Sequence, residues 1–452
     1  MKPGRPRITW TSCSDGPGDG PRVLGINPWI HDFAAYGLWS RPAGLLAALH
    51  MLRAAGARVA LMDCLDRSWS AASWPKAHPT GKGPYLKTPL PKPAALQGVP
   101  RRYSRYGNHP DTVREALRRL SPQPDLVLVT TVMTYWYPGA AEAVGMVREI
   151  WPDVPVVLGG IYATLCPEHA ACLGADLVLS GRLEDRQVWA RLWSLLGRET
   201  PALPAGAGLE LALDLYAEPG FSVILGSRGC PFRCAYCASG RLHPGFRQAG
   251  AEAVLAAVRR EYARGVRDFA FYDDALLVSP QTWLWPLLDW FEGKGARLHT
   301  PNAMHVRYLT TEVCARLRRA GFRTIRLGLE TEDFEHRRDV KLSREQWEAG
   351  MAALRGAGFG PGEVVAYILF GLPDQNRSEV ERTIALARDW GVRPELAHFT
   401  PIPSSPLFDR ACEVSPWPLR EEPLCQNNSI WPCVDGGYTP ERARYWRGLL
   451  DV

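Results

Sequence analysis

Three cysteines lie close together in the stretch SRGCPFRCAYCASG, at Cys230, Cys234 and Cys237, and no fourth cysteine follows nearby. Cysteine thiolates are the usual ligands of iron–sulfur clusters, and three of them can hold three irons of a cubic four-iron cluster. The fourth iron is then open to a ligand that is not protein. The alternatives are a zinc site, which His243 would have to complete, or buried thiols. Because zinc typically takes four ligands in paired-cysteine spacings, the pattern favours the cluster.

The composition sets bounds on what else the chain can be. Its 452 residues are 46% hydrophobic and 22% charged, which are ordinary values for a globular protein with two or three domains. The net charge of +6 is small for this length, so nucleic-acid binding is not expected. No signal peptide or membrane span is visible, which predicts a cytoplasmic protein. The 11 cysteines are then better explained as ligands and buried thiols than as disulfides.

The elements that must position the three cysteines form an alternation of strands and helices over residues 221–405. Six such repeats predict a parallel, partial TIM-like (β/α)6 barrel, in which the chemistry lies where the strands end. The cysteines follow the first strand of the repeat. They are therefore expected at the working end of the barrel.

An earlier alternation, over residues 21–197, predicts a separate Rossmann-like α/β domain. Continuous Val, Leu and Ile strands separated by helices are typical of a doubly wound parallel sheet. Residues 66–110, rich in Pro, Lys and aromatics, interrupt it as an irregular insertion, either a surface excursion or a lid. The remaining segments are a flexible N-terminus (1–20), a linker (198–220) and a short irregular C-terminal extension (406–452).

Cys230-x-x-x-Cys234-x-x-Cys237 resembles the signature of radical S-adenosylmethionine (SAM) enzymes. Residues 23–182, from VLGINPW through PVVLGGIYATLCPEHA to ADLVLSGR, are similar to the cobalamin (B12)-binding domain that one branch of this family carries. The resemblance implies a [4Fe–4S] cluster whose open iron is chelated by SAM. It also implies reductive cleavage of SAM to a 5′-deoxyadenosyl radical and an electron donor such as a flavodoxin or ferredoxin.

Seven further residues are assigned to SAM by the same resemblance. Phe232 and Tyr236 would shield the cluster or touch adenine, and Gly371 would flank the adenine. An acidic residue after the second strand and one on the fourth would contact the ammonium or ribose, and Asn302 and His305 would face the site. The complete set of SAM-binding candidates is Phe232, Tyr236, Asp273, Asp274, Asn302, Glu330 and Gly371. Asp273 has the alternative of capping a helix, and Asp273-Asp274 replaces the more common Gly-Gly-Glu.

The candidates for cobalamin lie at strand ends of the first domain, where doubly wound sheets bind ligands. They are Thr130, Thr131, Gly159 and Gly160. The glycines would let the backbone approach the corrin or its nucleotide tail, or would simply close a tight strand end. No Asp-x-His-x-x-Gly motif is present, so cobalt is expected to lack a histidine ligand; His31 is the only histidine in the appropriate loop.

The implied function is cobalamin-dependent methylation of an unactivated carbon. Two alternatives remain open: a radical rearrangement, cyclisation or oxidation without methyl transfer, and a sensor that binds cluster and corrinoid without turnover. The sequence does not identify the substrate, a small molecule or peptide, or the oligomeric state. It also assigns no function to Cys412, Cys425 and Cys433 in the C-terminal extension.

Overall fold

The computed structural model describes residues 8–12, 19–70, 81–339 and 341–451. The chain divides into two compact units, one of Met1–Gln97 with Arg101–Gly220 and the other of Gly98–Pro100 with Phe221–Val452. None of the helices in the described residues has both the length and the apolar character needed to cross a membrane.

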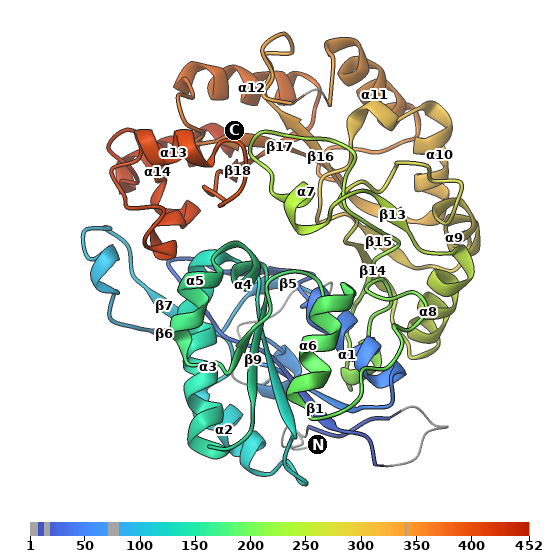
Figure 1. Cartoon of the computed structure of the whole chain (residues 1–452). Coiled ribbons are helices and arrows are strands. Elements are labelled where there is room, and N and C mark those ends of the chain that lie inside the picture. Colours follow the sequence, from blue (N-terminus) through green and yellow to red (C-terminus); the bar gives the residue numbers. More distant parts are fainter. Residues whose placement is uncertain (1–7, 13–18, 71–80, 340, 452) are drawn as a thin grey trace. The chain divides into compact units, whose positions relative to one another are not determined.

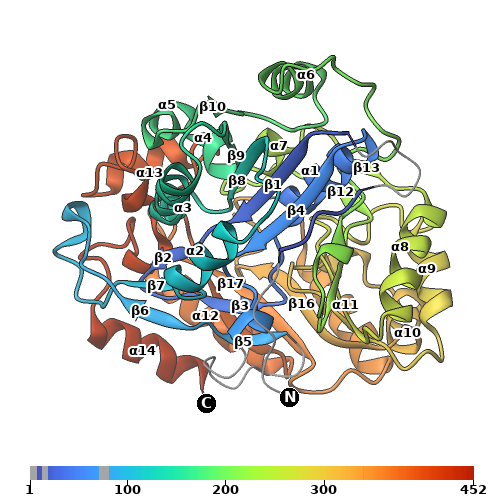
Figure 2. The same cartoon turned by 90° about the horizontal axis from the view of Figure 1, so that it is seen from below.

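The first unit is built on a parallel sheet of five strands. Its order is β10 (Leu177–Val178), β9 (Val156–Gly160), β8 (Leu126–Thr131), β1 (Arg22–Asn27) and β4 (Arg58–Asp63). Strands β1, β4 and β8 are buried along almost all of their length, and β9 is buried over its first three residues, because helices cover the sheet. These helices are α1 (Ala43–Ala54), α2 (Pro110–Arg118), α3 (Tyr137–Ile150), α4 (Ile161–Leu165), α5 (Pro167–Ala170) and α6 (Arg186–Leu195). Figure 2 shows β1 and β4 side by side.

The predicted irregular insertion is more ordered than its sequence suggests. Its described part contains β5 (Lys82–Pro84), β6 (Lys87–Pro89) and β7 (Ser104–Tyr106), and residues 71–80 lie outside the described ones. Strand β7 pairs with β6 and with β2 (Ile30–Asp32), while β5 pairs with β3 (Tyr36–Leu38). Each of these strands has only three residues, and β5 and β6 both end at a proline, but the pairing ties the insertion to the loop after β1.

At the N-terminus, the prediction of a flexible segment over 1–20 falls mostly on residues outside the described ones. In the described part, the backbone of Thr11 pairs with Val59, and the Trp10 indole donates a hydrogen bond to the Pro122 carbonyl.

The second unit contains a parallel sheet of six strands. Their order is β11 (Ser222–Ile224), β14 (Asp268–Phe271), β15 (Arg297–His299), β16 (Phe322–Glu330), β17 (Val364–Phe370) and β18 (Arg393–His398). The strands follow chain order, and β11 and β18 are the two edges. The sheet is therefore an open, partial barrel, as the sequence predicted.

Helices of the second unit alternate with its strands and lie along their outer side (Figure 1). They are α8 (Ala251–Ala263), α9 (Leu284–Phe291), α10 (Thr311–Ala320), α11 (Arg344–Gly356) and α12 (Arg377–Asp389). One hydrophobic core joins the two layers and includes Phe269, Ile325, Leu327, Trp347 and Ile368, each fully buried. The C-terminal extension adds α13 (Phe408–Val414) and α14 (Pro440–Leu450), and its Trp431 packs edge-on against Phe370 of β17.

Candidate functional site

The three cysteines occupy a loop held at its base by two short strands. Strand β12 (Ser227–Arg228) pairs with β13 (Arg247–Gln248), and the residues between them include the short helix α7 (Ser239–Leu242). Gly229, just before Cys230, has a φ of 80°, and a Cβ there would lie 2.0 Å from the carbonyl oxygen of Gly245. Only glycine fits this close crossing of the two strands, so Gly229 fixes where the loop begins.

The three thiols differ in exposure but share an electrostatic environment. Cys234 is buried, Cys230 is half-buried and Cys237 is exposed. Burial raises the pKa of the Cys230 and Cys234 thiols, that of Cys234 to about 11, and the positive charge of Lys341 opposes this rise at both. Because iron binds the thiolate, this buried cation favours the ligand form of the loop.

Asp273, which follows β14, is tied to the base of the cysteine loop. Its Oδ1 accepts hydrogen bonds from the Ser227 hydroxyl (2.6 Å) and from the Gly226 amide (3.1 Å). Its Oδ2 is buried and has no hydrogen-bond partner among the described residues. Burial raises the pKa of Asp273 to about 7. The alternative that Asp273 caps a helix is wrong, because the next helix, α9, has Trp283 at its N-cap.

Asp274 contacts the other end of the same loop. Its Oδ2 accepts a hydrogen bond of 2.6 Å from the hydroxyl of Ser239, two residues after Cys237. Both acidic residues expected to seat SAM therefore hold the cysteine loop, and the unpartnered oxygen of Asp273 is the acceptor left for a ligand.

Glu330, the last residue of β16, has a strained backbone. Its φ is 68°, and the pairing register with β17 shifts between Gly328 and Glu330. Positive φ values in residues other than glycine concentrate at functional sites. The Glu330 side chain is buried and pairs with Lys341 Nζ at 3.1 Å, so the chain itself supplies the partner that a buried carboxylate needs. Although burial acts against it, the Glu330 charge raises the pKa of Lys341 above its usual value.

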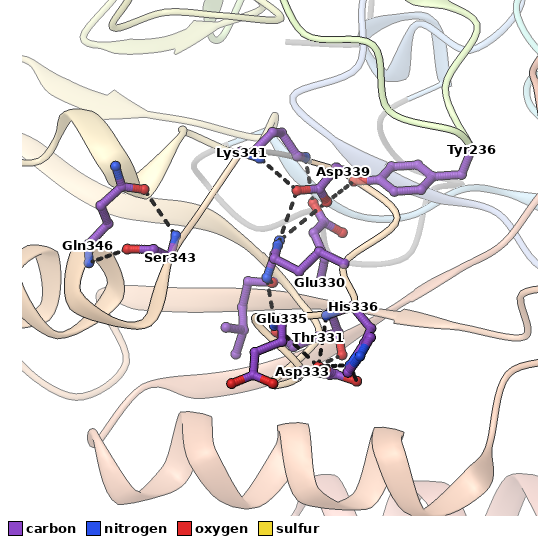
Figure 3. Close-up of polar contacts among 12 residues, drawn as sticks. Tyr236, Glu330, Thr331, Asp333, Glu335, His336, Asp339, Lys341, Ser343 and Gln346 are labelled. Atoms are coloured by element: carbon purple, nitrogen blue, oxygen red, sulfur yellow. Dashed lines mark hydrogen bonds and ion pairs between the residues drawn. The ribbon is translucent and has the colours of Figure 1, made fainter.

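Lys341 belongs to a network that connects the loop after β16 to the cysteine loop (Figure 3). The Tyr236 hydroxyl donates a hydrogen bond of 3.1 Å to Asp339, and the Lys341 ammonium lies 5.5 Å from the centre of the Tyr236 ring. Asp339 also pairs with Arg337, whose guanidinium bonds the carbonyls of Leu329 and Thr331. Tyr236, placed next to Cys237 in sequence, is thereby fixed beside the buried cation.

The other predicted contacts of this unit lie around the same strand ends. Phe232 packs against His305 with ring centres 4.7 Å apart, and the His305 Nε2 is 3.9 Å from the Cys230 sulfur. Asn302 is exposed and donates to the Tyr272 carbonyl at 2.8 Å. Gly371 has a φ of 82°, and its amide donates to Gln375 Oε1 at 2.8 Å, so Gln375 stabilises this turn.

The candidate cobalamin residues come together at the ends of two neighbouring strands of the first unit. Thr130 pairs with Gly159 and Thr131 with Gly160, and the Thr131 hydroxyl donates to the Gly159 carbonyl at 3.2 Å. Gly160 has a φ of 96°, and a Cβ there would lie 2.4 Å from the Thr131 carbonyl oxygen. The backbone conformation at position 160 and the close approach of Thr131 therefore require a glycine there. A Cβ on Gly159 would meet no described atom within 4 Å, so the space above Gly159 is open to a ligand.

His31, on β2, has a side-chain partner. Its Nε2 lies 2.8 Å from Glu142 of α3, and Arg105 of β7 binds the other oxygen of Glu142 at 2.7 Å. Nearby, the Trp136 indole donates to Asp32 at 2.7 Å. The loop after β1 is thus held by charged pairs, with the insertion strand β7 as one contributor.

The sequence analysis missed Lys341, Asp339 and Arg337. The available signal was the charged run RRDVK at 337–341, in the loop after β16, because residues that follow a strand of a parallel barrel lie at its working end. Their mutual contacts depend on the path of the loop, which the sequence pattern does not determine.

Comparison with known families assigns both units. Residues 224–387 match the model of the radical SAM superfamily, and residues 97–188 match that of the B12 binding domain. The chain therefore contains a radical SAM domain and a B12-binding domain, which confirms the class inferred from the cysteine motif. These domains imply a four-iron cluster, SAM and cobalamin as cofactors, as expected.

Two individual proteins are similar over most of the chain. An uncharacterized methyltransferase of Pyrococcus horikoshii is 25% identical over 324 residues, which cover 64% of this chain and 69% of that protein. The radical SAM methyltransferase TsrM from Kitasatospora setae, whose structure contains a tryptophan substrate and a SAM analogue, has a TM-score of 0.62 at 16% identity. That comparison covers 88% of this chain and 77% of the TsrM chain, and it shows a shared fold.

The donor groups of the described residues fit these cofactors. Three soft thiols in one anchored loop are the donors that a four-iron cluster takes. The unpartnered Oδ2 of Asp273 offers an acceptor to an ammonium group. The open space at Gly159, where β9 ends next to Thr130 of β8, leaves room for part of a corrinoid.

Proposed function

We propose that this protein is a radical SAM methyltransferase that uses cobalamin to methylate an unactivated carbon. The observation that carries the proposal is the combination of a radical SAM domain and a B12-binding domain in one chain. The similarity to a methyltransferase over 64% of the chain points in the same direction.

In this proposal the residues of the second unit hold the cluster and SAM. Cys230, Cys234 and Cys237 supply the thiolates, and Lys341 favours their ionised form. Asp273 and Asp274 keep the loop in place, and Glu330 and the free oxygen of Asp273 accept hydrogen bonds from SAM. When bound, the cluster and SAM supply an electron and a carbon radical, and cobalamin supplies the methyl group.

Thr130, Thr131 and Gly159 are the residues of the first unit that we assign to cobalamin. The hydroxyl of Thr130 is available to a phosphate or amide of the nucleotide tail, while Gly160 keeps the two strand ends close together. The reducing electron would come from a flavodoxin or ferredoxin.

The test is an anaerobic assay of the reconstituted, reduced protein with SAM, in the presence and absence of cobalamin. Methyl transfer from SAM should give S-adenosylhomocysteine only when cobalamin is present, and radical cleavage should give 5′-deoxyadenosine. Replacing Cys230, Cys234 and Cys237 together by alanine should abolish 5′-deoxyadenosine and the binding of about four irons per chain. A C412A variant is the matched control. Formation of 5′-deoxyadenosine with no cobalamin-dependent S-adenosylhomocysteine would instead favour a rearrangement, cyclisation or oxidation.

A further inference from the structure

Arg326 lies in the middle of β16, on the face of the strand that does not pack against the helices. Ile325, Leu327 and Leu329 belong to the hydrophobic core between sheet and helices. Because side chains alternate along a strand, Arg326 lies on the opposite, inner face. It is nevertheless buried, with 4% of its surface exposed.

The guanidinium of Arg326 lies 5.8 Å from the centre of the Tyr367 ring, and it is incompletely paired. Its Nε and Nη1 have no hydrogen-bond partner among the residues that the structure describes, which leaves three of its five N–H donors unused. Its Nη2 is 3.7 Å from Glu395, a distance too long for a hydrogen bond. Glu395 is 39% exposed and also lies 3.4 Å from Arg393. Glu395, the acidic residue near Arg326, is therefore shared with Arg393 and partly exposed to water.

Another buried arginine of the same unit shows what complete pairing looks like. The side chain of Arg337 is 3% exposed, and its three nitrogens bond Asp339 and two backbone carbonyls. A buried charge without such partners is costly. Arg326 thus resembles a binding group that awaits a ligand more than a structural ion pair.

We propose that Arg326 anchors a carboxylate group of the substrate. This inference rests on the proposed function, because it names the class of substrate for that site. A guanidinium presents planar donors that match a carboxylate. A monoanion is favoured over a phosphate dianion, because a single arginine with the Glu395 carboxylate nearby offers little compensation for a second negative charge.

The position of Arg326 relative to Glu330 supports a substrate site. The pairing register shifts between Gly328 and Glu330, and the Glu330 carboxylate turns toward the face of β16 that carries Arg326. Gly328, between them on this face, has no side chain, and the Glu330 carboxylate bends over it, since a Cβ on Gly328 would lie 2.7 Å from Glu330 Oε1. A carboxylate bound at Arg326 would hold a small molecule with its other end toward Glu330.

The test compares Arg326→Met with Arg323→Met in the full chain, reconstituted with its cluster and SAM. Arg323 is exposed on the same strand, so its variant controls for the loss of one positive charge. The probes are acetate and benzoate as monocarboxylates, benzamide as a neutral analogue of benzoate, and inorganic phosphate. Scanning calorimetry gives the melting temperature, and its dependence on probe concentration gives Kd.

We expect a monocarboxylate to raise the melting temperature of the wild type and of Arg323→Met, and benzamide to have no effect. Arg326→Met should bind the monocarboxylate at least about tenfold more weakly than the wild type does. In the absence of a probe, this variant should melt at no lower temperature than the wild type. Arg326→Lys, which keeps the charge but not the planar fork, should show intermediate affinity. The proposal would be overturned if a monocarboxylate raised the melting temperature of the wild type and of Arg326→Met equally, or did not raise that of the wild type. An Arg326-dependent rise with phosphate alone would overturn the carboxylate assignment. None of these readouts requires turnover, so they succeed or fail independently of methyl transfer.

Discussion

At the scale of single residues, the acidic groups near the cysteine loop have different functions. Asp273 and Asp274 bond the loop, whereas Glu330 pairs with a buried lysine beside it. Neutralising Glu330 should therefore weaken SAM binding without removing the cluster.

For Glu330→Gln we expect a ten- to hundredfold loss of SAM affinity with unchanged iron content, because a charge-assisted hydrogen bond is worth roughly 1.5 to 3 kcal/mol. Equilibrium dialysis with labelled SAM and an iron assay measure the two quantities. Glu332→Gln is the matched control, since Glu332 pairs with Arg382 instead. Wild-type affinity in Glu330→Gln would show that Glu330 serves only to neutralise Lys341.

Asp273 should make the stability of the protein depend on pH. Burial raises its pKa to about 7 in the folded state from 3.8, so between these values the folded protein keeps a proton that the unfolded chain has lost. The contribution of protonated Asp273 to the stability of the folded state is then fully present below pH 4 and is lost as the pH rises to 7. Over this range the free energy of unfolding falls by at most about 1.4 kcal/mol per pH unit. Asp273→Asn imitates the protonated form, so its melting temperature should rise relative to the wild type between pH 5 and 8. A constant difference across this range would contradict the assignment.

At the scale of elements, the crossing of β12 and β13 positions the three cysteines. Gly229→Ala would place a Cβ 2.0 Å from a backbone oxygen at a φ of 80°, so the loop must shift. We expect Gly229→Ala to lower iron loading, measured after anaerobic reconstitution. Gly240→Ala, in α7 of the same loop, meets no described atom within 4 Å and should load normally. Equal iron loading of the two variants would mean that the cysteine loop still binds iron when its base is shifted.

Much of this architecture could be predicted from the sequence, because it follows from periodicity. The buried strands β8 (LVLVTT) and β17 (VVAYILF) are continuous apolar runs, and both lie in parallel sheets as expected. The cysteine spacing likewise identified the class of the protein.

The missed features depend on contacts between distant residues. Lys341 follows Glu330 by 11 residues, and only the path of the loop brings the two within 3.1 Å. Arg326 was hidden by its setting, since an arginine within an apolar run gives no indication of which partners it lacks. The short strands of the insertion were obscured by prolines, which reduce strand propensity without preventing edge pairing.

At the scale of the whole molecule, the distribution of histidines determines how cobalamin can be bound. In the described part of the first unit, His31 pairs with Glu142, His50 with Glu210, and His169 with the Tyr162 hydroxyl. Each of these interactions would be broken or weakened if the ring turned to a metal. The exposed His109 lies at the start of α2, next to its partner Asp111.

We therefore expect the full chain to bind cob(II)alamin without a histidine ligand to cobalt. The paramagnetic resonance spectrum of the complex should lack splitting by a protein nitrogen, and His31→Ala should leave the spectrum unchanged. The affinity of the domain for cobalamin must then come from contacts with the edges of the corrin and with the nucleotide tail. Thr130, Thr131 and the open space at Gly159 would have to provide these contacts. Gly159→Ala should accordingly lower the affinity in an optical titration, whereas His31→Ala should lower it little. Nitrogen splitting that disappears in His31→Ala would instead show that Glu142 releases His31 when cobalamin binds, since the pair would have to open to free the imidazole.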